Sequence, residues 1–198
     1  RLGIKCYDKE LLELAAKESG LCQELFASQD EKPTNSFLYS LVMDTYSLGY
    51  SNSYVDMPIN HKVFLAQFDA IKKLAERESC VIVGRCADYI LKDNPDVISV
   101  FFYSDVEERI QWSIDEYQVP AKQAKKIVQE KDAQRSRFYE FYTNQKWGNP
   151  RNYTLMINTS KMSTEETVQL LASFYDAKKG ILTFKNAFEN QYEKDNKY

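Results

Sequence analysis

Two short segments of the chain are apolar at nearly every position, and this pattern limits the choice of fold more than any other feature. They are Cys80–Val83 and Val97–Phe102, and patterns of amphipathic helices lie between and beyond them. A strand that is apolar on both faces is buried between helices in a parallel sheet. The alternation of strand and helix therefore predicts an α/β fold, a three-layer sandwich with a mainly parallel sheet.

The same alternation extends toward both ends of the chain. Ile4–Tyr7 predicts a strand, followed by Asp8 as the N-cap of a helix over Lys9–Lys17 that stops before Gly20. Thr154–Ile157 predicts the last strand. With 198 residues, the chain has the length of one ordinary globular domain.

Start signals place the remaining helices. Asn60 can cap one helix, and a long polar helix runs from Ala121 to about Tyr142. Ser104 and Ser163 each precede a Glu by three residues, which is the pattern of a capping box. The segment after Gly180 predicts a last helix packed on the body, with an oligomer contact as the alternative.

Charge and cysteine content exclude several classes of protein. A net charge of −3 provides no general attraction to nucleic acid or to an anionic membrane, and no apolar run is long enough to span a bilayer. Four cysteines and one histidine without a C-x-x-C spacing argue against a structural zinc site and support no disulfide framework. We expect a cytoplasmic protein with reduced thiols.

Glycine is scarce, and its positions exclude a phosphate-binding loop within these residues. The six glycines are all well separated in the sequence, whereas phosphate loops and dinucleotide fingerprints need several glycines close together. A phosphate site built on side chains is not excluded by this absence.

In a parallel α/β sheet, ligands bind beyond the carboxyl ends of the strands. The sequence brings three polar groups to that edge: Asp8–Lys9, Arg85 with Asp88, and Asn158–Ser160. Arg85 directly follows an apolar strand, so its guanidinium must meet an anion. Two partners are open: the phosphate of a ligand, or a structural ion pair, for example with Asp8 or Asp88.

The long polar helix carries several cations, and the sequence leaves two interpretations of them. Val128, Lys131, Arg135 and Phe138 share one face at helical spacing. That face is either solvated or folded over the crevice at the sheet edge. His61 has no sequence partner that would make it a general base, so a structural or exposed histidine is expected.

Four blocks resemble the cytidylate kinase-like family of bacterial P-loop proteins. In chain order they are Leu2–Asp8, Val81–Leu91, Lys131–Arg135 and Asn152–Thr159. The resemblance implies the fold of nucleoside monophosphate kinases: a parallel five-stranded sheet, a helical acceptor-binding insertion and an arginine-bearing lid. The family's first strand and Gly-rich phosphate loop are expected just before Arg1.

On this resemblance the chain divides into a kinase-like domain and a terminal helix. The domain covers residues 1–178, with the insertion at 21–60 and the lid at 121–147. Residues 179–198 form the C-terminal helix or tail. A homodimer is one arrangement that this division allows.

The implied reaction transfers the γ-phosphoryl group of ATP, with Mg²⁺, to a nucleoside monophosphate such as CMP. Such chemistry depends on positive charge and positioning more than on covalent catalysis. The residues expected in these roles are Arg85, Asp8, Asp88 and Lys9 for the acceptor, Arg135, Arg137 and Asp132 for catalysis from the lid, and Arg109 for the donor base.

Two other functions remain open beside this one. The same fold could phosphorylate another small metabolite, or it could bind nucleotides as a regulatory module without turnover. Val83 stands where cytidylate kinases have an Asp before the Gly-Arg pair, and Cys86 stands where they have an Asp after it.

Overall fold

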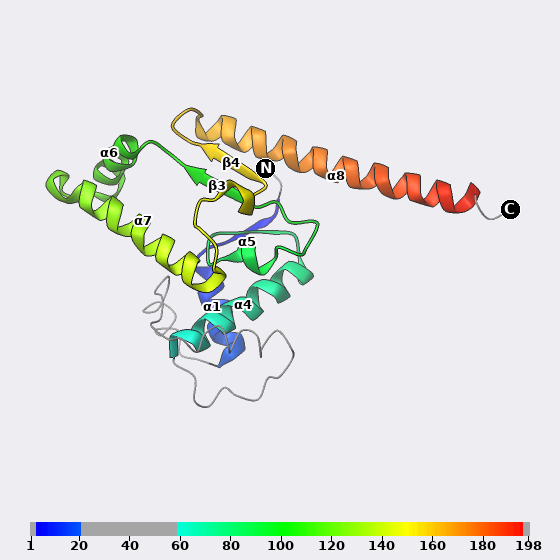
Figure 1. The fold of residues 1–198 in the computed structure, drawn as a ribbon, viewed down its shortest axis with the longest axis horizontal. Coiled ribbons are helices and arrows are strands. Elements are labelled where there is room, and N and C mark those ends of the chain that lie inside the picture. The colour runs from blue at the N-terminus through cyan, green and yellow to red at the C-terminus, as the bar shows by residue number, and fades with distance from the viewer. Residues whose placement is uncertain (1–2, 21–58, 196–198) are drawn as a thin grey trace.

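The computed structural model describes residues 3–20 and 59–195 of the chain, with side chains for 3–20 and 61–179. The predicted insertion, 21–60, therefore lies outside the described residues except for its last two residues, 59 and 60, which begin α4. Figure 1 shows the arrangement of the elements. In chain order they are β1 (Lys5–Tyr7), α1 (Glu10–Ser19), α4 (Ile59–Arg77), β2 (Cys80–Ile82), α5 (Ala87–Ile90), β3 (Val100–Tyr103), α6 (Val106–Tyr117), α7 (Ala121–Thr143), the 3₁₀ turn η1 (Pro150–Asn152), β4 (Leu155–Asn158) and α8 (Thr164–Asp195).

The strands pair in parallel, as the sequence predicts, and the mixed α/β class is confirmed. β1 pairs with β2 in a register that places Tyr7 beside Ile82, and β3 pairs with β4 with Phe102 beside Ile157. The described strands form two separate pairs, not the single sheet of a three-layer sandwich.

The prediction that β2 is covered on both faces is wrong for the described part of the chain. Val81 and the adjoining Val83 are 46% and 45% exposed, and Phe102 of β3 is 50% exposed. Within the described residues β2 pairs only with β1, and β3 only with β4, so each strand has one open edge. The two apolar segments do contain strands, β2 and β3, but no described element covers their exposed side chains.

The main core lies between α1, α4 and α5, beside β1 and β2. Helix α1 packs along α4, and α4 also contacts α5 and β2. The apolar positions of α4 predicted from helical spacing, including Ile71 and Leu74, are buried here. The buried members are Leu11, Leu12, Ala15, Ala16, Val63, Ala70, Ile71, Leu74, Ala87 and Ile90.

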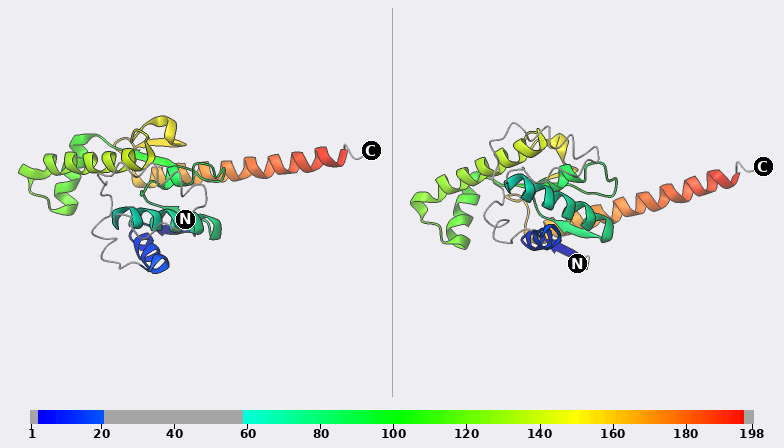
Figure 2. Two further views of the ribbon diagram at one scale, coloured as in Figure 1. Left: turned by 60° about the horizontal axis from the view of Figure 1, so that its bottom comes forward. Right: turned by 90° about the horizontal axis from the view of Figure 1, so that it is seen from below.

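Helix α7 forms an arm with α6, and α8 leaves the body. Figure 2 shows α6 and α7 extending from one end of the molecule and α8 from the other. The sequence predicts the long helix α7 to within a residue of its observed start and end. The predicted break at Gly180 and the docking of a separate last helix are wrong: α8 continues through Gly180 as one helix and projects away from the strands (Figures 1 and 2).

One of the two predicted capping boxes forms. At the start of α8 the backbone N–H of Glu166 donates to Ser163 Oγ at 3.2 Å, and the N–H of Ser163 donates to Glu166 Oε2 at 2.8 Å. These hydrogen bonds lower the pKa of the Glu166 carboxyl. At α6 the cap residue is Asp105, not Ser104, and it makes no side-chain cap bond. The second box is therefore absent. Asp105 instead contacts Ser160 and Lys161, which directly follow β4.

The cap at Ser163 yields a stability prediction. Ser163→Ala removes the acceptor for the N–H of Glu166, and the loss of an N-cap hydroxyl typically costs about 1 kcal/mol. We expect a loss of that size in the free energy of unfolding, measured by urea denaturation. Ser173→Ala, an exposed serine of the same helix, is the control and should change stability by less than about 0.5 kcal/mol. Equal effects of both variants would contradict the capping role.

Candidate active site

The chain makes a strained left-handed turn directly after β2. Gly84, Arg85 and Cys86 all have positive φ angles, of 70°, 54° and 57°. Glycine adopts this conformation freely, but for a residue with a side chain such strain costs on the order of 1–3 kcal/mol. Strained residues persist only where the surrounding structure holds them, and they cluster at functional sites. The turn is therefore the first candidate for a functional element.

The turn directs Arg85 back toward the end of β1. Its guanidinium Nη1 donates to Asp8 Oδ1 at 3.0 Å and to the carbonyl oxygen of Val83 at 2.9 Å. Arg85 is 6% exposed as a residue, while the side chain of Asp8 is 53% exposed. Of the two partners considered from the sequence, the structure contains the ion pair with Asp8. This pair joins the carboxyl ends of β1 and β2, where the sequence placed both residues.

The predicted role of Asp8 as a helix cap is wrong. The cap position of α1 is Lys9, and it makes no side-chain cap bond. Asp8 contacts the first turn through its backbone: its carbonyl accepts from the N–H of Leu11 at 3.3 Å, and its N–H donates to Glu10 Oε2 at 3.2 Å. Its carboxylate is used by Arg85 instead. Lys9 is exposed at the same edge.

Aromatic packing holds the other side of the turn. Cys86 is buried in a cluster with Phe64 of α4 and Phe138, Tyr139 and Tyr142 of α7. The rings of Phe64 and Tyr142 stack with centroids 3.8 Å apart and an angle of 10° between planes. Through this cluster the end of α7 and the start of α4 both pack around Cys86, the residue that follows Arg85.

A hydrogen-bond network centred on Tyr139 adjoins this cluster. The Tyr139 hydroxyl donates to Asp88 Oδ2 at 2.7 Å and lies 3.3 Å from Gln145 Oε1, and it accepts from Asn152 Nδ2 at 3.4 Å. Burial raises the pKa of the Asp88 carboxyl above its ordinary value, although the bond from Tyr139 works in the opposite direction. Burial and the neighbouring Asp88 also raise the pKa of Tyr139, so the phenol remains a hydrogen-bond donor at neutral pH.

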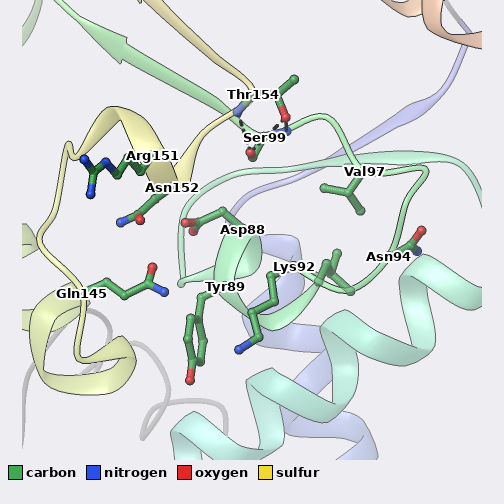
Figure 3. A pocket seen from close by; sticks show the side chains of 11 residues that line it. Asp88, Tyr89, Lys92, Asn94, Val97, Ser99, Gln145, Arg151, Asn152 and Thr154 are labelled. Atoms are coloured by element: carbon green, nitrogen blue, oxygen red, sulfur yellow. Dashed lines mark hydrogen bonds between the residues drawn. The ribbon is translucent and has the colours of Figure 1, made fainter.

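Asp88 and its neighbours line a cavity of about 260 Å³ (Figure 3). The cavity lies between α5, the loop before β3 and the segment that joins α7 to β4. Ser99 and Thr154, which hydrogen-bond to one another, close it at the amino ends of β3 and β4. Asp88 thus faces a different place from Arg85, although both follow the same strand.

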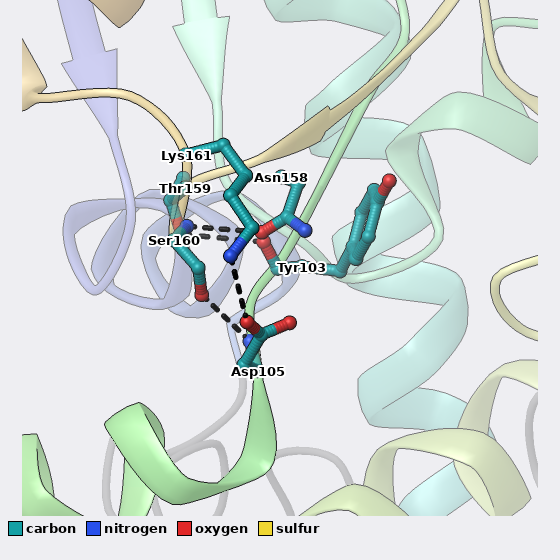
Figure 4. Close-up of polar contacts among 6 residues, drawn as sticks. All are labelled: Tyr103, Asp105, Asn158, Thr159, Ser160 and Lys161. Atoms are coloured by element: carbon teal, nitrogen blue, oxygen red, sulfur yellow. Dashed lines mark hydrogen bonds and ion pairs between the residues drawn. The ribbon is translucent and has the colours of Figure 1, made fainter.

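A second polar group lies at the carboxyl ends of β3 and β4 (Figure 4). Ser160 Oγ accepts from the N–H of Asp105 at 2.7 Å, and Lys161 Nζ lies 3.3 Å from Asp105 Oδ2. The N–H of Thr159 donates to the carbonyl oxygen of Tyr103 at 2.8 Å. The polar residues that the sequence placed after the last strand, Asn158–Ser160, are thus found at the expected edge.

An ion pair between Arg109 and Asp132 joins the two helices of the α6–α7 arm. Arg109 Nη1 donates to both carboxylate oxygens of Asp132, at 2.8 and 2.7 Å. These residues were expected at the donor base and in the lid, and the structure brings them together. Arg135 and Arg137 lie on exposed positions of α7. Of the eight residues expected at the site, two pairs are therefore in direct contact: Arg85 with Asp8, and Arg109 with Asp132.

The family follows from the sequence as a whole. The model of the cytidylate kinase-like family matches residues 1–161. The chain belongs to this family. It is also similar to a solved structure, described as "Crystal structure of uncharacterized protein from Eubacterium ventriosum ATCC 27560", with 28% identity and a TM-score of 0.64. That match covers 88% of this chain and 84% of the other. No curated protein matches the chain.

Membership of the cytidylate kinase-like family points to a nucleotide kinase-type function with a small-molecule nucleotide as substrate. The residues present do not by themselves make a magnesium site. Val83 has no ligand atom in its side chain, and the nearby Asp8 carboxylate is paired with Arg85. Among the described side chains, no three His, Cys, Asp or Glu gather as metal ligands do. No described helix is long and apolar enough to cross a membrane.

Sequence reasoning missed the network around Tyr139. Tyr139 lies within Phe138–Thr143, a run in which aromatic residues occupy both faces of the helix, so periodicity does not show which hydroxyl is buried. Gln145 and Asn152 lie in a loop whose path no local pattern predicts. Trp147-Gly148-Asn149-Pro150 in that loop indicates a turn but does not show which side chains it brings into contact.

The raised pKa of Asp88 yields a pH-dependent prediction. Because the folded protein holds this proton more tightly than the unfolded chain, the contribution of Asp88 to stability falls as pH rises from its ordinary pKa of 3.8 to the raised value. Asp88→Asn keeps an acceptor for Tyr139 and has no charge to desolvate. Its stability relative to wild type should therefore increase across that window and then become constant. Thermal unfolding from pH 3 to 8 measures this, and a constant difference would contradict it.

Proposed function

We propose that the protein transfers the γ-phosphoryl group of ATP to a nucleoside monophosphate, such as CMP, at the carboxyl ends of its strands. The observation that carries the proposal is the buried Arg85 on its strained turn, in a chain of the cytidylate kinase-like family. Phosphoryl transfer requires cations held at fixed positions around the migrating group. A buried guanidinium that bridges two strand ends is positioned in this way.

In this proposal Arg85 binds the acceptor phosphate. A guanidinium presents a planar fork of N–H donors that matches phosphate oxygens. Asp8, its present partner, is half exposed and can turn toward a ligand hydroxyl when a phosphate takes its place. Lys9 follows Asp8 at the same edge and adds a positive charge there. Asp88 faces the cavity and Tyr139 instead of Arg85, so in this proposal it acts on the acceptor site indirectly.

The α7 arm is the lid in this proposal. Arg135 and Arg137 are exposed on α7, where a closing movement would bring them over the crevice. Asp132 holds Arg109 on α6, so the two helices would move together. A lid of this kind supplies charge in the transition state and excludes water. Release of Arg109 from Asp132 would let it stack on the donor base.

The donor requires a phosphate loop, which the family resemblance implies. Within the described residues β2 and β3 each have one open edge, and Val81 and Phe102 are about half exposed, which supports a further parallel strand between them in this proposal. Such a strand would carry the loop to the same edge as Arg85. ATP with Mg²⁺ is the proposed donor, and no step here is assigned to the metal.

A nucleotide-binding module without turnover is the second candidate. Val83 supports it, because the position before Gly84 offers no carboxylate to organise a metal ion. Phosphorylation of a different small metabolite is the third, and it would use the same Arg85. The two candidates differ in whether any product forms.

The test uses the full translated protein, ATP with Mg²⁺ and a panel of nucleoside monophosphates. We expect formation of a nucleoside diphosphate from at least one of them. Arg85→Lys keeps the charge but loses the fork, and we expect a rise of roughly tenfold or more in the KM of the acceptor. Arg77→Ala, an exposed arginine beside Glu78, is the control and should behave as wild type. ATP binding without product from any nucleoside monophosphate would overturn the proposed reaction and favour the regulatory module or the phosphorylation of a different metabolite.

The lid is tested by charge removal on α7. Arg135→Gln and Arg137→Gln each remove a proposed transition-state cation, and the loss of such a group typically costs about 10²-fold in kcat. Lys122→Gln, exposed in the first turn of the same helix, is the matched control. Rates within twofold of wild type for both arginine variants would mean that this face of α7 is only solvated.

A further inference from the structure

Tyr139 is held by contacts with several different parts of the fold. It lies near the end of α7, is only 5% exposed and belongs to the aromatic cluster around Cys86. Its hydroxyl contacts Asp88 of α5 at 2.7 Å and Asn152 of η1 at 3.4 Å. Buried hydroxyls require such partners, because an unpaired one costs on the order of 1–3 kcal/mol.

Asp88 connects this hydroxyl to the strained turn. It is the second residue of α5, a four-residue helix that begins directly after Cys86. Asp88 lies three residues after Arg85 in the chain. A displacement of Asp88 is therefore passed to Arg85 along this short segment.

We infer that Tyr139 is a positioning residue that couples the α7 arm to the Arg85 turn through Asp88. The Gly84–Cys86 turn is strained, so it needs support from outside, and the Tyr139 hydroxyl supplies it from α7. Movement of the arm then shifts the acceptor-binding arginine. The link to catalysis rests on the proposed function, whereas the mechanical coupling does not.

The hydroxyl, not the ring, makes the specific contact. The ring packs against Tyr153 at a centroid distance of 6.5 Å and within the cluster around Cys86, and a phenylalanine would keep this packing. Tyr139→Phe removes only the bonds to Asp88 and its neighbours. The charged residues that line the cavity together with Asp88 are Lys92, which follows the end of α5, and Arg151 of η1 (Figure 3).

The test measures hydrogen exchange in the full protein. In Tyr139→Phe we expect the amides of residues 84–90 to exchange roughly 2- to 30-fold faster, which is the usual range for the loss of a coupling contact. Amides of α1 should not change. Tyr175→Phe, on α8, is the matched control and should leave residues 84–90 at wild-type rates.

Kinetics provide the second readout. Tyr139→Phe should raise the KM of the acceptor by a similar factor with a smaller change in the KM of ATP, because the acceptor arginine is displaced. Asp88→Asn, which retains an acceptor for the phenol, should keep most of the coupling, whereas Asp88→Ala should reproduce Tyr139→Phe. Exchange of residues 84–90 at wild-type rates in Tyr139→Phe would overturn the inference. If no acceptor is phosphorylated, the proposed function fails, but the exchange result still decides the coupling.

Discussion

The described part of the fold depends on the burial of one positive charge. Removing a guanidinium from water is costly unless it is paired, and removing its partner afterwards is strongly destabilising. Arg85 meets this requirement with the Asp8 carboxylate and the Val83 carbonyl, which come from the ends of neighbouring strands. The pairing works only when β1 and β2 lie in the observed register and the chain turns through three left-handed residues.

The polar residues at the strand ends form two separate centres. One joins β1 and β2 through Arg85, and the other joins β3 and β4 through Asp105, Ser160 and Lys161. Both lie at the carboxyl ends of parallel strands, where loops and helix starts converge. The Asp88 cavity lies elsewhere, toward the amino ends of β3 and β4. Asp88 is connected to Arg85 along the chain, through the start of α5.

Much of this architecture could be predicted from local sequence patterns. The periodicity of α4, the extent of α7, the capping box at Ser163 and the parallel pairing all follow from residue spacing and chain order. The failures have a common cause, which is competition between partners for one side chain. Asp8 is a good cap in isolation, but the long-range ion pair with Arg85 takes its carboxylate, and at α6 the cap position falls on Asp105, paired with Lys161, and not on Ser104. The contacts of Tyr139 depend on a loop path that no local pattern encodes.

The length of α8 has a practical consequence. A continuous helix of 32 residues extends about 48 Å, and Figure 1 shows its far half leaving the body. A fluorophore or surface attachment on that half would be held away from the strand ends at a nearly fixed distance. Energy transfer between such a label and a second one on the α6–α7 arm, at the other end of the molecule, would then measure the arm movement that the proposed lid requires.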